Sequence, residues 1–316
     1  LETYNPIGTV AYYERPIYKQ LRQLYSGQGI EWNKLSVKKL VHDQIGYAKW
    51  WDIKNYKSYN HHLSHAAAGF QTSLFTRATV VVIDAIGEWE TISIWGAEYD
   101  DKGKAVYKKL WQQNYPHSIG LFYTGVTQRV GLRPLDEEYI LMGMAAYGER
   151  GFGDLLKMDA IDHEWDIKFK QNMHTGIECK YLTSSTSDMD VAAAAQDLAE
   201  DLILNVMLRA KQFNWSKNLV YMGGVALNCA ANARIGNYFD DIWIMPNPGD
   251  AGSSLGAAAL AYGGRVNWTS AYLGHNIPGV YPVNDILDEL LTRQIVGVAS
   301  GRAEFGPRAL GNRSLL

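Results

Sequence analysis

Three histidines, at positions 61, 62 and 65, lie within the short stretch "NHHLSHAAAG". His61 and His65 are four residues apart, so a helix would place both imidazoles on one face with Cβ atoms about 5–6 Å apart. Two imidazoles at that spacing can bind one metal ion, whereas His62 would point elsewhere and is not expected to be a ligand. The spacing alone is equally compatible with a purely structural pair of histidines.

Two aspartates add carboxylates to this candidate site. Asp84 ends a β-branched run, "TVVVIDAIG" (79–87), and Asp250 stands in "NPGDAG" (247–252), where a helix is expected to begin. Ligands of open α/β sheets bind at the carboxyl ends of the strands, so both carboxylates are expected near the histidines. Two histidines with one or two carboxylates suit divalent iron or zinc, and an open coordination position suits catalysis.

Glycines mark three junctions where backbone N–H groups could approach a phosphate: "IDAIGEWE" (83–90), "MGGVALN" (222–228) and "NPGDAGSSLGAAA" (247–259). Tight turns and helix N-termini of this kind bind anions. A plain turn or the close packing of small residues explains each junction equally well when it is taken alone. The candidate residues at these junctions are Gly87, Gly223, Gly224, Gly249 and Ser253.

The order of the expected elements indicates one α/β layer. Hydrophobic patterning predicts strands and helices in an order β-β-β, then α, then β-α-β-α. The first three strands are expected to form an antiparallel meander, and Asp188 or Asp190 to cap the long helix. This is the order of a ribonuclease-H-like layer, the unit that is doubled in actin-like ATPases. The ranges are 79–87, 91–99 and 105–113 for the meander, then 116–131 and about 190–212 (helices), 218–224 (strand), 226–239 (helix), 241–246 (strand) and 250–263 (helix).

Composition limits the classes of protein to which the chain can belong. Its 316 residues are 47% hydrophobic and 20% charged, with a net charge of -3, so the surface as a whole does not attract nucleic acid. We find no apolar run long enough to cross a bilayer and no signal peptide. Cys179 and Cys229 lie far apart, which predicts no disulfide framework and fits the cytoplasm. The chain starts without methionine and ends in sequence that reads as unfinished, so we expect a fragment.

One stretch, residues 34–57, is basic and rich in aromatic side chains. We interpret it as a solvated loop region anchored by its aromatic residues, and keep a nucleic-acid groove as the alternative. The residues concerned are Lys34, Lys38, Lys39, Lys49, Lys54 and Lys57, with Tyr47, Trp50, Trp51 and Tyr56.

Several motifs together give the chain a family resemblance from about residue 55 to its end. In order they are "NHHLSHAA", "VVVIDAIGEWET", "NYPHSIGLFYTGVTQRVGLR", "EEYILMGMAAYGE", "YMGGVALNCAANARI", "NPGDAGSSLGAAALAY", "AYLG" and "GRAEFGPRALGNRSLL". This set resembles the NodU/CmcH-type O-carbamoyltransferases. The first domain of those proteins is similar to the enzymes that make threonylcarbamoyl-adenosine in tRNA.

The resemblance implies a fold and a reaction. The fold would be a two-lobed actin-like ATPase domain over residues 1–275, truncated at its N-terminus. A linker and the start of a YrdC-like α/β domain would follow over 276–316. The reaction would use ATP and carbamoyl phosphate to form carbamoyl-adenylate, and then transfer the carbamoyl group to an acceptor hydroxyl. The general base would come from an early histidine-containing loop of the family that these residues lack, so no catalytic residue is assigned.

The resemblance also implies roles for individual residues. The metal ligands would be His61, His65, Asp84 and Asp250, holding divalent iron in preference to zinc or manganese. Asp136 and Glu138 are candidates for acceptor binding, with a solvated acidic loop equally compatible. The nucleotide or carbamoyl-adenylate would contact Gly87, Gly143, Gly223, Gly224, Asn228, Gly249 and Ser253. Carbamoyl phosphate would contact the arginines of the C-terminal motif, for which Arg302, Arg308 and Arg313 are the candidates.

Three functional hypotheses remain at this point. The first is an O-carbamoyltransferase acting on an antibiotic precursor, an aminoglycoside, an oligosaccharide or a hydroxymethylated base in DNA. The second is a tRNA-modifying enzyme of the threonylcarbamoyl-adenosine type, against which the fused "EFGPRALGNRS" segment argues. The third is a non-catalytic, nucleotide-binding actin-like scaffold, against which the set of four metal-ligand candidates argues.

Overall fold

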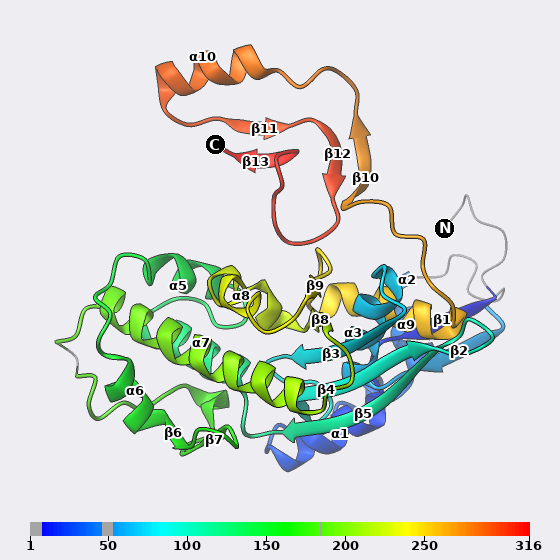
Figure 1. The fold of residues 1–316 in the computed structure, drawn as a ribbon, viewed down its shortest axis with the longest axis horizontal. Helices are drawn as coiled ribbons and strands as arrows, with labels where there is room; N and C mark the ends of the chain where they lie inside the picture. The colour runs from blue at the N-terminus through cyan, green and yellow to red at the C-terminus, as the bar shows by residue number, and fades with distance from the viewer. Residues whose placement is uncertain (1–7, 46–52, 184) are drawn as a thin grey trace.

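A five-stranded mixed sheet forms the centre of the protein (Figure 1). The computed structural model describes residues 8–45, 53–183 and 185–316. The strand order is β5-β4-β3-β8-β9, with β3 to β5 antiparallel and β8 and β9 parallel to β3. This order confirms the predicted meander and the α/β layer of the ribonuclease-H type. The strands are β3 (Arg77–Ile83), β4 (Glu90–Tyr99), β5 (Ala105–Asn114), β8 (Asn218–Met222) and β9 (Asp241–Trp243).

Strand β3 is buried on both faces because helices cover both sides of the sheet. Val80 and Val82 pack with helix α3 (His61–Thr72), while Val81 and Ile83 pack with α4 (Ile119–Arg129) and α7 (Asp188–Gln212). Successive side chains of a strand point to opposite faces, so a centrally placed strand needs the continuous β-branched run seen in its sequence.

Small residues allow α3 to lie between the sheet and helix α9 (Asp250–Tyr262). Ala66, Ala67 and Ala68 are fully buried. A Cβ atom on Gly256 of α9 would lie 1.8 Å from the carbonyl oxygen of Ser64, so the two helix backbones touch. Small residues on both helices thus allow the N-terminal part of α3 to pack closely against α9.

Several predicted boundaries were wrong by a few residues. The long helix is capped by Ser187, whose Oγ accepts from the Asp190 N–H at 3.2 Å, and by neither aspartate. Ser118 caps α4, so that helix begins at 119 and not 116. The predicted helix at 226–239 is a 3₁₀ turn, Gly224–Leu227, followed by a shorter helix α8, Cys229–Ile235. The strand predicted to end at 246 ends at Trp243, since Pro246 and Pro248 cannot donate to a ladder.

The segment before α3 adds a two-stranded sheet, whose strand β1 packs against α9. Strands β1 (Thr9–Tyr12) and β2 (Asn55–Ser58) pair in parallel. Helices α1 (Pro16–Tyr25) and α2 (Val37–Ile45), with a 3₁₀ turn at Trp32–Lys34, lie between them in sequence. Four residues of the predicted basic and aromatic stretch, namely Tyr47, Lys49, Trp50 and Trp51, lie outside the described residues.

A C-terminal group of short elements lies mostly outside the sheet layer and meets it at Phe305 and Gly306 (Figure 1). Strand β10 pairs with β12, and β11 pairs with β13, both antiparallel. The division predicted at 275/276 stays a prediction; β10 lies across that position. The elements are β10 (Tyr272–Ile277), α10 (Val283–Arg293), β11 (Gly297–Ala299), β12 (Gly301–Glu304) and β13 (Arg313–Leu315).

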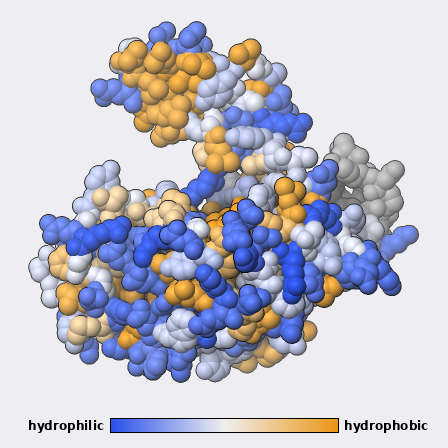
Figure 2. All heavy atoms as spheres, in the orientation of Figure 1, coloured by the Kyte–Doolittle hydropathy of each residue, from blue (hydrophilic) through white to orange (hydrophobic). Residues whose placement is uncertain are grey.

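Hydrophobic side chains gather on the surface of this C-terminal group (Figure 2). Val283, Leu287 and Leu291 of α10 are all exposed. Helices α5 (Glu138–Met144) and α6 (Gly153–Ala160) pack against α7, and strand β6 (Ile161–His163) pairs with β7 (Lys168–Phe169). A 3₁₀ turn, Met173–Thr175, packs against α4. Within the described residues, no helix combines the length and apolar character needed to cross a bilayer.

Candidate metal centre

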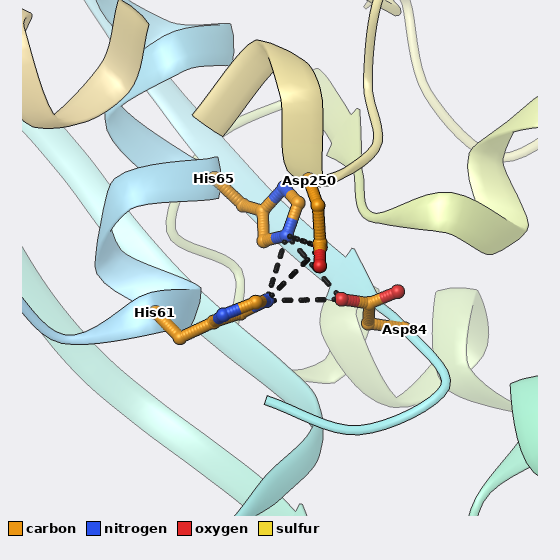
Figure 3. A group of neighbouring side chains, drawn as sticks. All are labelled: His61, His65, Asp84 and Asp250. Carbon is orange, nitrogen blue, oxygen red and sulfur yellow. Dashed lines mark hydrogen bonds and ion pairs between the residues drawn. The ribbon is translucent and has the colours of Figure 1, made fainter. Parts of the chain in front are cut away.

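The two histidines lie in the first turns of α3 (Figure 3). Asn60 caps this helix by accepting the Leu63 N–H at 2.9 Å, which fixes where the helix begins. His61 and His65 therefore lie one turn apart on the same face, as predicted, and their Nε2 atoms are 3.1 Å apart. Both rings are buried, with 2% and 0% of their surface exposed.

The two aspartates come from different elements, and each places a carboxylate oxygen beside the histidine Nε2 atoms. Asp84 follows β3, and its Oδ1 accepts the backbone N–H groups of Ala85 (2.9 Å) and Gly224 (3.2 Å). Its other oxygen, Oδ2, lies 3.1 Å from His61 Nε2. Asp250 is the first residue of α9, and its Oδ1 lies 3.2 Å from His65 Nε2. One carboxylate oxygen of Asp84 is thus held by the backbone while the other faces the histidines.

The geometry of the four donors fits a divalent metal ion. One ligand atom from each of His61, His65, Asp84 and Asp250 lies within 4.8 Å of the others. Bonds of about 2.0–2.1 Å to a tetrahedral ion place neighbouring ligand atoms about 3.3 Å apart, and the contacts around the two Nε2 atoms measure 3.1–3.3 Å. Three ligand residues are buried, but the Asp250 side chain is 55% exposed, so the cluster is open on that side.

Backbone and side-chain groups behind the ligands orient the two rings. The carbonyl oxygen of Pro248 lies 3.0 Å from His65 Nδ1, which sets that nitrogen as the donor and leaves Nε2 free to coordinate. His61 Nδ1 is buried and has no hydrogen-bond partner among the described residues. The nearest carboxylate, Glu14, lies 3.8 Å from it and is itself held by Lys19 at 2.8 Å. Sequence reasoning missed Glu14 and Pro248, because neither belongs to a pattern with a recognisable spacing.

Mutual interaction sets the charges of this cluster. Burial alone would lower the pKa of His61, but hydrogen bonds to Asp250 and Asp84 outweigh it and raise that pKa well above its usual value. Burial alone would raise the pKa of Asp84, but its hydrogen bonds with His61 and His65 hold that pKa well below the usual range. A bound cation takes the place of the histidine protons in such a cluster, because imidazole coordinates in its neutral form.

His62 is outside the cluster, as predicted. Its Nδ1 lies 2.7 Å from Ser93 Oγ, on the sheet side of α3. Burial, reinforced by the charge on His61, lowers the pKa of His62 to about 3, so this ring is neutral at physiological pH.

The predicted glycine junctions lie beside the ligands. A Cβ on Gly87 would lie 3.0 Å from the rings of His61 and His62. Gly223 has φ +92°, and a Cβ there would lie 2.1 Å from the carbonyl oxygen of Ile83. Gly249 is the N-cap residue of α9, and the hydroxyl of Ser253 donates to the Asp250 carbonyl at 2.5 Å. These residues bring the backbone of all three junctions up to the candidate metal centre.

Two other nucleotide candidates are placed differently. The Asn228 side chain caps α8 by accepting the Ala231 N–H at 3.0 Å, and it exchanges hydrogen bonds with Gln196 at 2.9 and 3.0 Å. Gly143 lies in α5 with open space where a Cβ would stand. For both residues, contact with a nucleotide stays a prediction.

The acceptor candidates make local contacts. Asp136 pairs with Arg133 at 2.7 Å on the surface. Glu138 Oε1 accepts from the Thr124 hydroxyl and from the Leu135 N–H, both at 2.7 Å. Neither carboxylate belongs to the metal-ligand cluster, and their role in acceptor binding stays a prediction.

The three candidate arginines of the C-terminal motif have different surroundings. Arg313 donates from Nε to Glu304 at 2.6 Å and from Nη2 to the Gly306 carbonyl oxygen at 2.9 Å. Arg302 is exposed, and the half-buried Arg308 lies with its guanidinium 5.6 Å from the centre of the Tyr139 ring. Within the described part of the chain, neither Arg302 nor Arg308 forms a salt bridge, so their guanidinium groups are the more available for an anion.

Two matches to known protein families show which family the chain belongs to. The family described as "Carbamoyltransferase N-terminus" matches residues 17–259, and the one described as "Carbamoyltransferase C-terminus" matches residues 287–316. The chain belongs to the carbamoyltransferase family. This confirms the resemblance that the motifs indicated, and it places the four converging side chains inside the N-terminal match of a carbamoyltransferase-family protein.

Three curated relatives of this carbamoyltransferase-family chain come from bacteria. An uncharacterised protein of Synechocystis sp. is 31% identical, over 86% of this chain and 52% of its own length. Nodulation protein NolO of Bradyrhizobium diazoefficiens is 28% identical, over 81% of this chain and 53% of its own length. Nodulation protein NolNO of Sinorhizobium fredii is also 28% identical, over 81% of this chain and 42% of its own. The chain therefore spans about half the length of the curated relatives it matches.

One solved structure that this chain matches in part is the activator of the 2-hydroxyisocaproyl-CoA dehydratase from Clostridium difficile with bound ADPNP. Its sequence identity to this chain is 14% and its TM-score is 0.44, covering 74% of this chain and 83% of the other. A likeness at this level supports no argument about function.

Proposed function

We propose that this protein is an ATP- and metal-dependent O-carbamoyltransferase that transfers a carbamoyl group from carbamoyl-adenylate to an acceptor hydroxyl. One observation carries the proposal: His61, His65, Asp84 and Asp250 converge where β3 ends and α9 begins, in a chain of the carbamoyltransferase family. A scaffold protein has no need of four such side chains on a common point.

The donor set would hold a divalent cation. Two imidazoles and two carboxylates suit iron and zinc alike, and the family resemblance favours iron over zinc or manganese. Such an ion would polarise the carbamoyl carbonyl and offset charge on the neighbouring phosphate. The chain's own part is to fix the ligands: the backbone at Ala85 and Gly224 holds Asp84, and the Pro248 carbonyl holds His65. The exposed side of Asp250 leaves room for a substrate.

The junctions around the ligands would bind the nucleotide. Gly223 and Gly224 bring backbone beside Asp84, and the N-terminus of α9 directs N–H groups toward the same region. A helix N-terminus attracts phosphate through its unpaired N–H groups and its dipole. This arrangement supports binding of the adenylate phosphate next to the metal ligands.

The reaction would proceed in two stages. Carbamate is a poor acyl donor because its nitrogen donates electrons into the carbonyl, so activation must precede transfer. Hydrolysis of carbamoyl phosphate would give carbamate and inorganic phosphate. A carbamate oxygen would then attack the α-phosphate of ATP, which expels pyrophosphate and gives the carbamoyl group AMP as a leaving group. Arg302 and Arg308 are proposed to bind carbamoyl phosphate, since an arginine fork binds phosphate oxygens in a bidentate way. The acceptor is a sugar, an aminoglycoside, an antibiotic precursor or a hydroxymethylated base in DNA.

The proposal is tested by incubating the full-length protein with ATP, carbamoyl phosphate, ferrous iron and a panel of hydroxyl acceptors. We expect one acceptor to gain about 43 Da by mass spectrometry while AMP is released, as group transfer through an activated intermediate requires. The panel contains sugars, aminoglycosides, nucleosides and DNA with hydroxymethylcytosine. If the metal-loaded protein releases no AMP with any acceptor, the proposal is wrong and a nucleotide-binding scaffold becomes the better interpretation.

A further inference from the structure

Glu304 is a buried carboxylate at the end of β12, within the motif "EFGPRALGNRS". Its side chain is completely shielded from solvent. Oε1 accepts the backbone N–H groups of Leu310 and Asn312, both at 2.8 Å, and that of Arg313 at 3.3 Å. Oε2 accepts Arg313 Nε at 2.6 Å. A single side chain therefore closes residues 305–312 into a loop, which we call the Glu304 loop.

Further hydrogen bonds hold the Glu304 loop from its surroundings. The Tyr272 hydroxyl donates to the Leu310 carbonyl at 3.1 Å, and the Tyr281 hydroxyl donates to the Gly311 carbonyl at 3.2 Å. The Asn312 side chain donates to the Arg302 carbonyl at 2.8 Å. This hydrogen bond links the backbone of Arg302 to the Glu304 loop, which also carries Arg308.

The Glu304 loop also touches the sheet layer next to a metal ligand. Gly306 has φ +135°, and a Cβ there would lie 2.4 Å from the Pro246 carbonyl oxygen, so only glycine fits. Phe305 packs against the buried cluster that contains Met245. Pro246 lies two residues before Pro248, which holds His65, and four before Asp250. The contact therefore joins the C-terminal motif directly to the segment that completes the candidate metal centre.

Charge strengthens the hold of Glu304 on this loop. Burial alone would raise the pKa of Glu304, but the bonds from Arg313 and from the loop N–H groups lower it to about 2. The side chain is therefore ionised at neutral pH. Hydrogen bonds to an ionised acceptor are roughly twice as strong as neutral ones, so a neutral amide of the same shape would hold the loop less well.

We propose that Glu304 is a positioning residue, which fixes the Glu304 loop and its Arg308 against the segment 245–250 that carries Asp250. The inference rests on the proposed function, because only that function assigns carbamoyl phosphate to Arg308. Glu304 itself contacts no substrate in this scheme. Its effect is to hold the phosphate-binding arginine at a fixed position relative to the metal centre.

The test compares full-length Glu304→Gln with the wild type. The matched control is Glu289→Gln, in which an exposed glutamate of α10 loses its pairing with Arg293. We expect faster hydrogen exchange at the amides of residues 310–313 in Glu304→Gln only. We expect the KM for carbamoyl phosphate in adenylate formation to rise about tenfold or more, since charged hydrogen bonds are lost, while kcat changes far less. Transfer from supplied carbamoyl-adenylate and the metal content should stay unchanged.

Unchanged exchange, or faster exchange with an unchanged KM, would each overturn the proposal. If Glu304→Gln also loses its metal, it has unfolded more widely, and Tyr281→Phe then decides the question. This variant removes one hydrogen bond to the Glu304 loop, so a smaller rise in the same KM is expected and an unaltered KM contradicts the proposal. A wild type that forms no AMP from ATP in the presence of carbamoyl phosphate would refute the proposed function instead. The exchange measurement would still show whether Glu304 orders the loop.

Discussion

Asp84 divides its two carboxylate oxygens between the backbone and the candidate metal centre. Oδ1 is occupied by the N–H groups of Ala85 and Gly224, so the carboxylate cannot rotate and Oδ2 stays beside His61. His65 is fixed in the same way by the Pro248 carbonyl. Ligands that are already oriented lose little freedom when an ion binds, which favours tight and selective binding.

At the residue scale, His65→Ala should abolish tight metal binding and leave the fold intact. The variant removes one of four ligands, and since changes behind the ligands already weaken binding 10–100-fold, we expect a loss of more than about 100-fold. Metal content after gel filtration, with circular dichroism for folding, measures this. The control is His163→Ala, because His163 is exposed and stands outside the cluster. Retained metal and full transfer activity in His65→Ala would rule out this site.

At the element scale, the junction after β8 has no space for a side chain. Gly223 combines φ +92° with a backbone carbonyl, that of Ile83, where its Cβ would stand. Gly103, in the turn between β4 and β5, has a similar φ of +73° but open space around it. Substituting alanine at each of the two positions therefore separates the cost of an unfavourable backbone conformation from the cost of a steric clash.

We expect Gly223→Ala to lower the free energy of unfolding by about 3 kcal/mol or more, because strain and overpacking add. Gly103→Ala should cost about 1–2 kcal/mol, from the left-handed backbone alone. Chemical denaturation of both variants measures the difference. Equal losses would mean that the chain relaxes around residue 223 and that the junction with Asp84 is less rigid than its contacts indicate.

At the scale of the whole molecule, the C-terminal group and the sheet layer are proposed to serve different half-reactions. The sheet layer carries the metal-ligand cluster, and the C-terminal group carries Arg302 and Arg308, neither of which forms a salt bridge within the described residues. They meet where Gly306 touches Pro246 and where Arg308 lies over Tyr139. If this proposal holds, we expect substitutions to affect activation and transfer separately.

Arg308→Ala in the full-length protein should block formation of carbamoyl-adenylate from carbamoyl phosphate, because a bidentate phosphate contact is removed. It should spare transfer of the carbamoyl group from supplied carbamoyl-adenylate. AMP release in the two assays distinguishes the steps, with Arg293→Ala on the exposed face of α10 as the control. An equal loss in both assays would contradict the assignment of the arginine to the first step.

The sequence by itself determined the layer and the candidate ligands. Alternating and continuous apolar runs report burial directly, so they located the strands of the central sheet, including β3. A four-residue spacing fixes which residues share a helix face, so the spacing alone was enough to pair His61 with His65. The ends of strands gather at one edge of a sheet, which brought Asp84 and Asp250 to the same place.

Only the tertiary structure decided how those side chains are held. The Pro248 carbonyl reaches His65 across 183 residues of sequence, and the Gly224 N–H reaches Asp84 across 140. Glu14 near His61 and Glu304 within its loop looked like ordinary charged residues, because local patterns carry no information on distant partners. Arg313 matched the family motif as well as Arg308 did, yet the fold directs it to Glu304. Such contacts arise from the packing of whole elements, which no short stretch of sequence specifies.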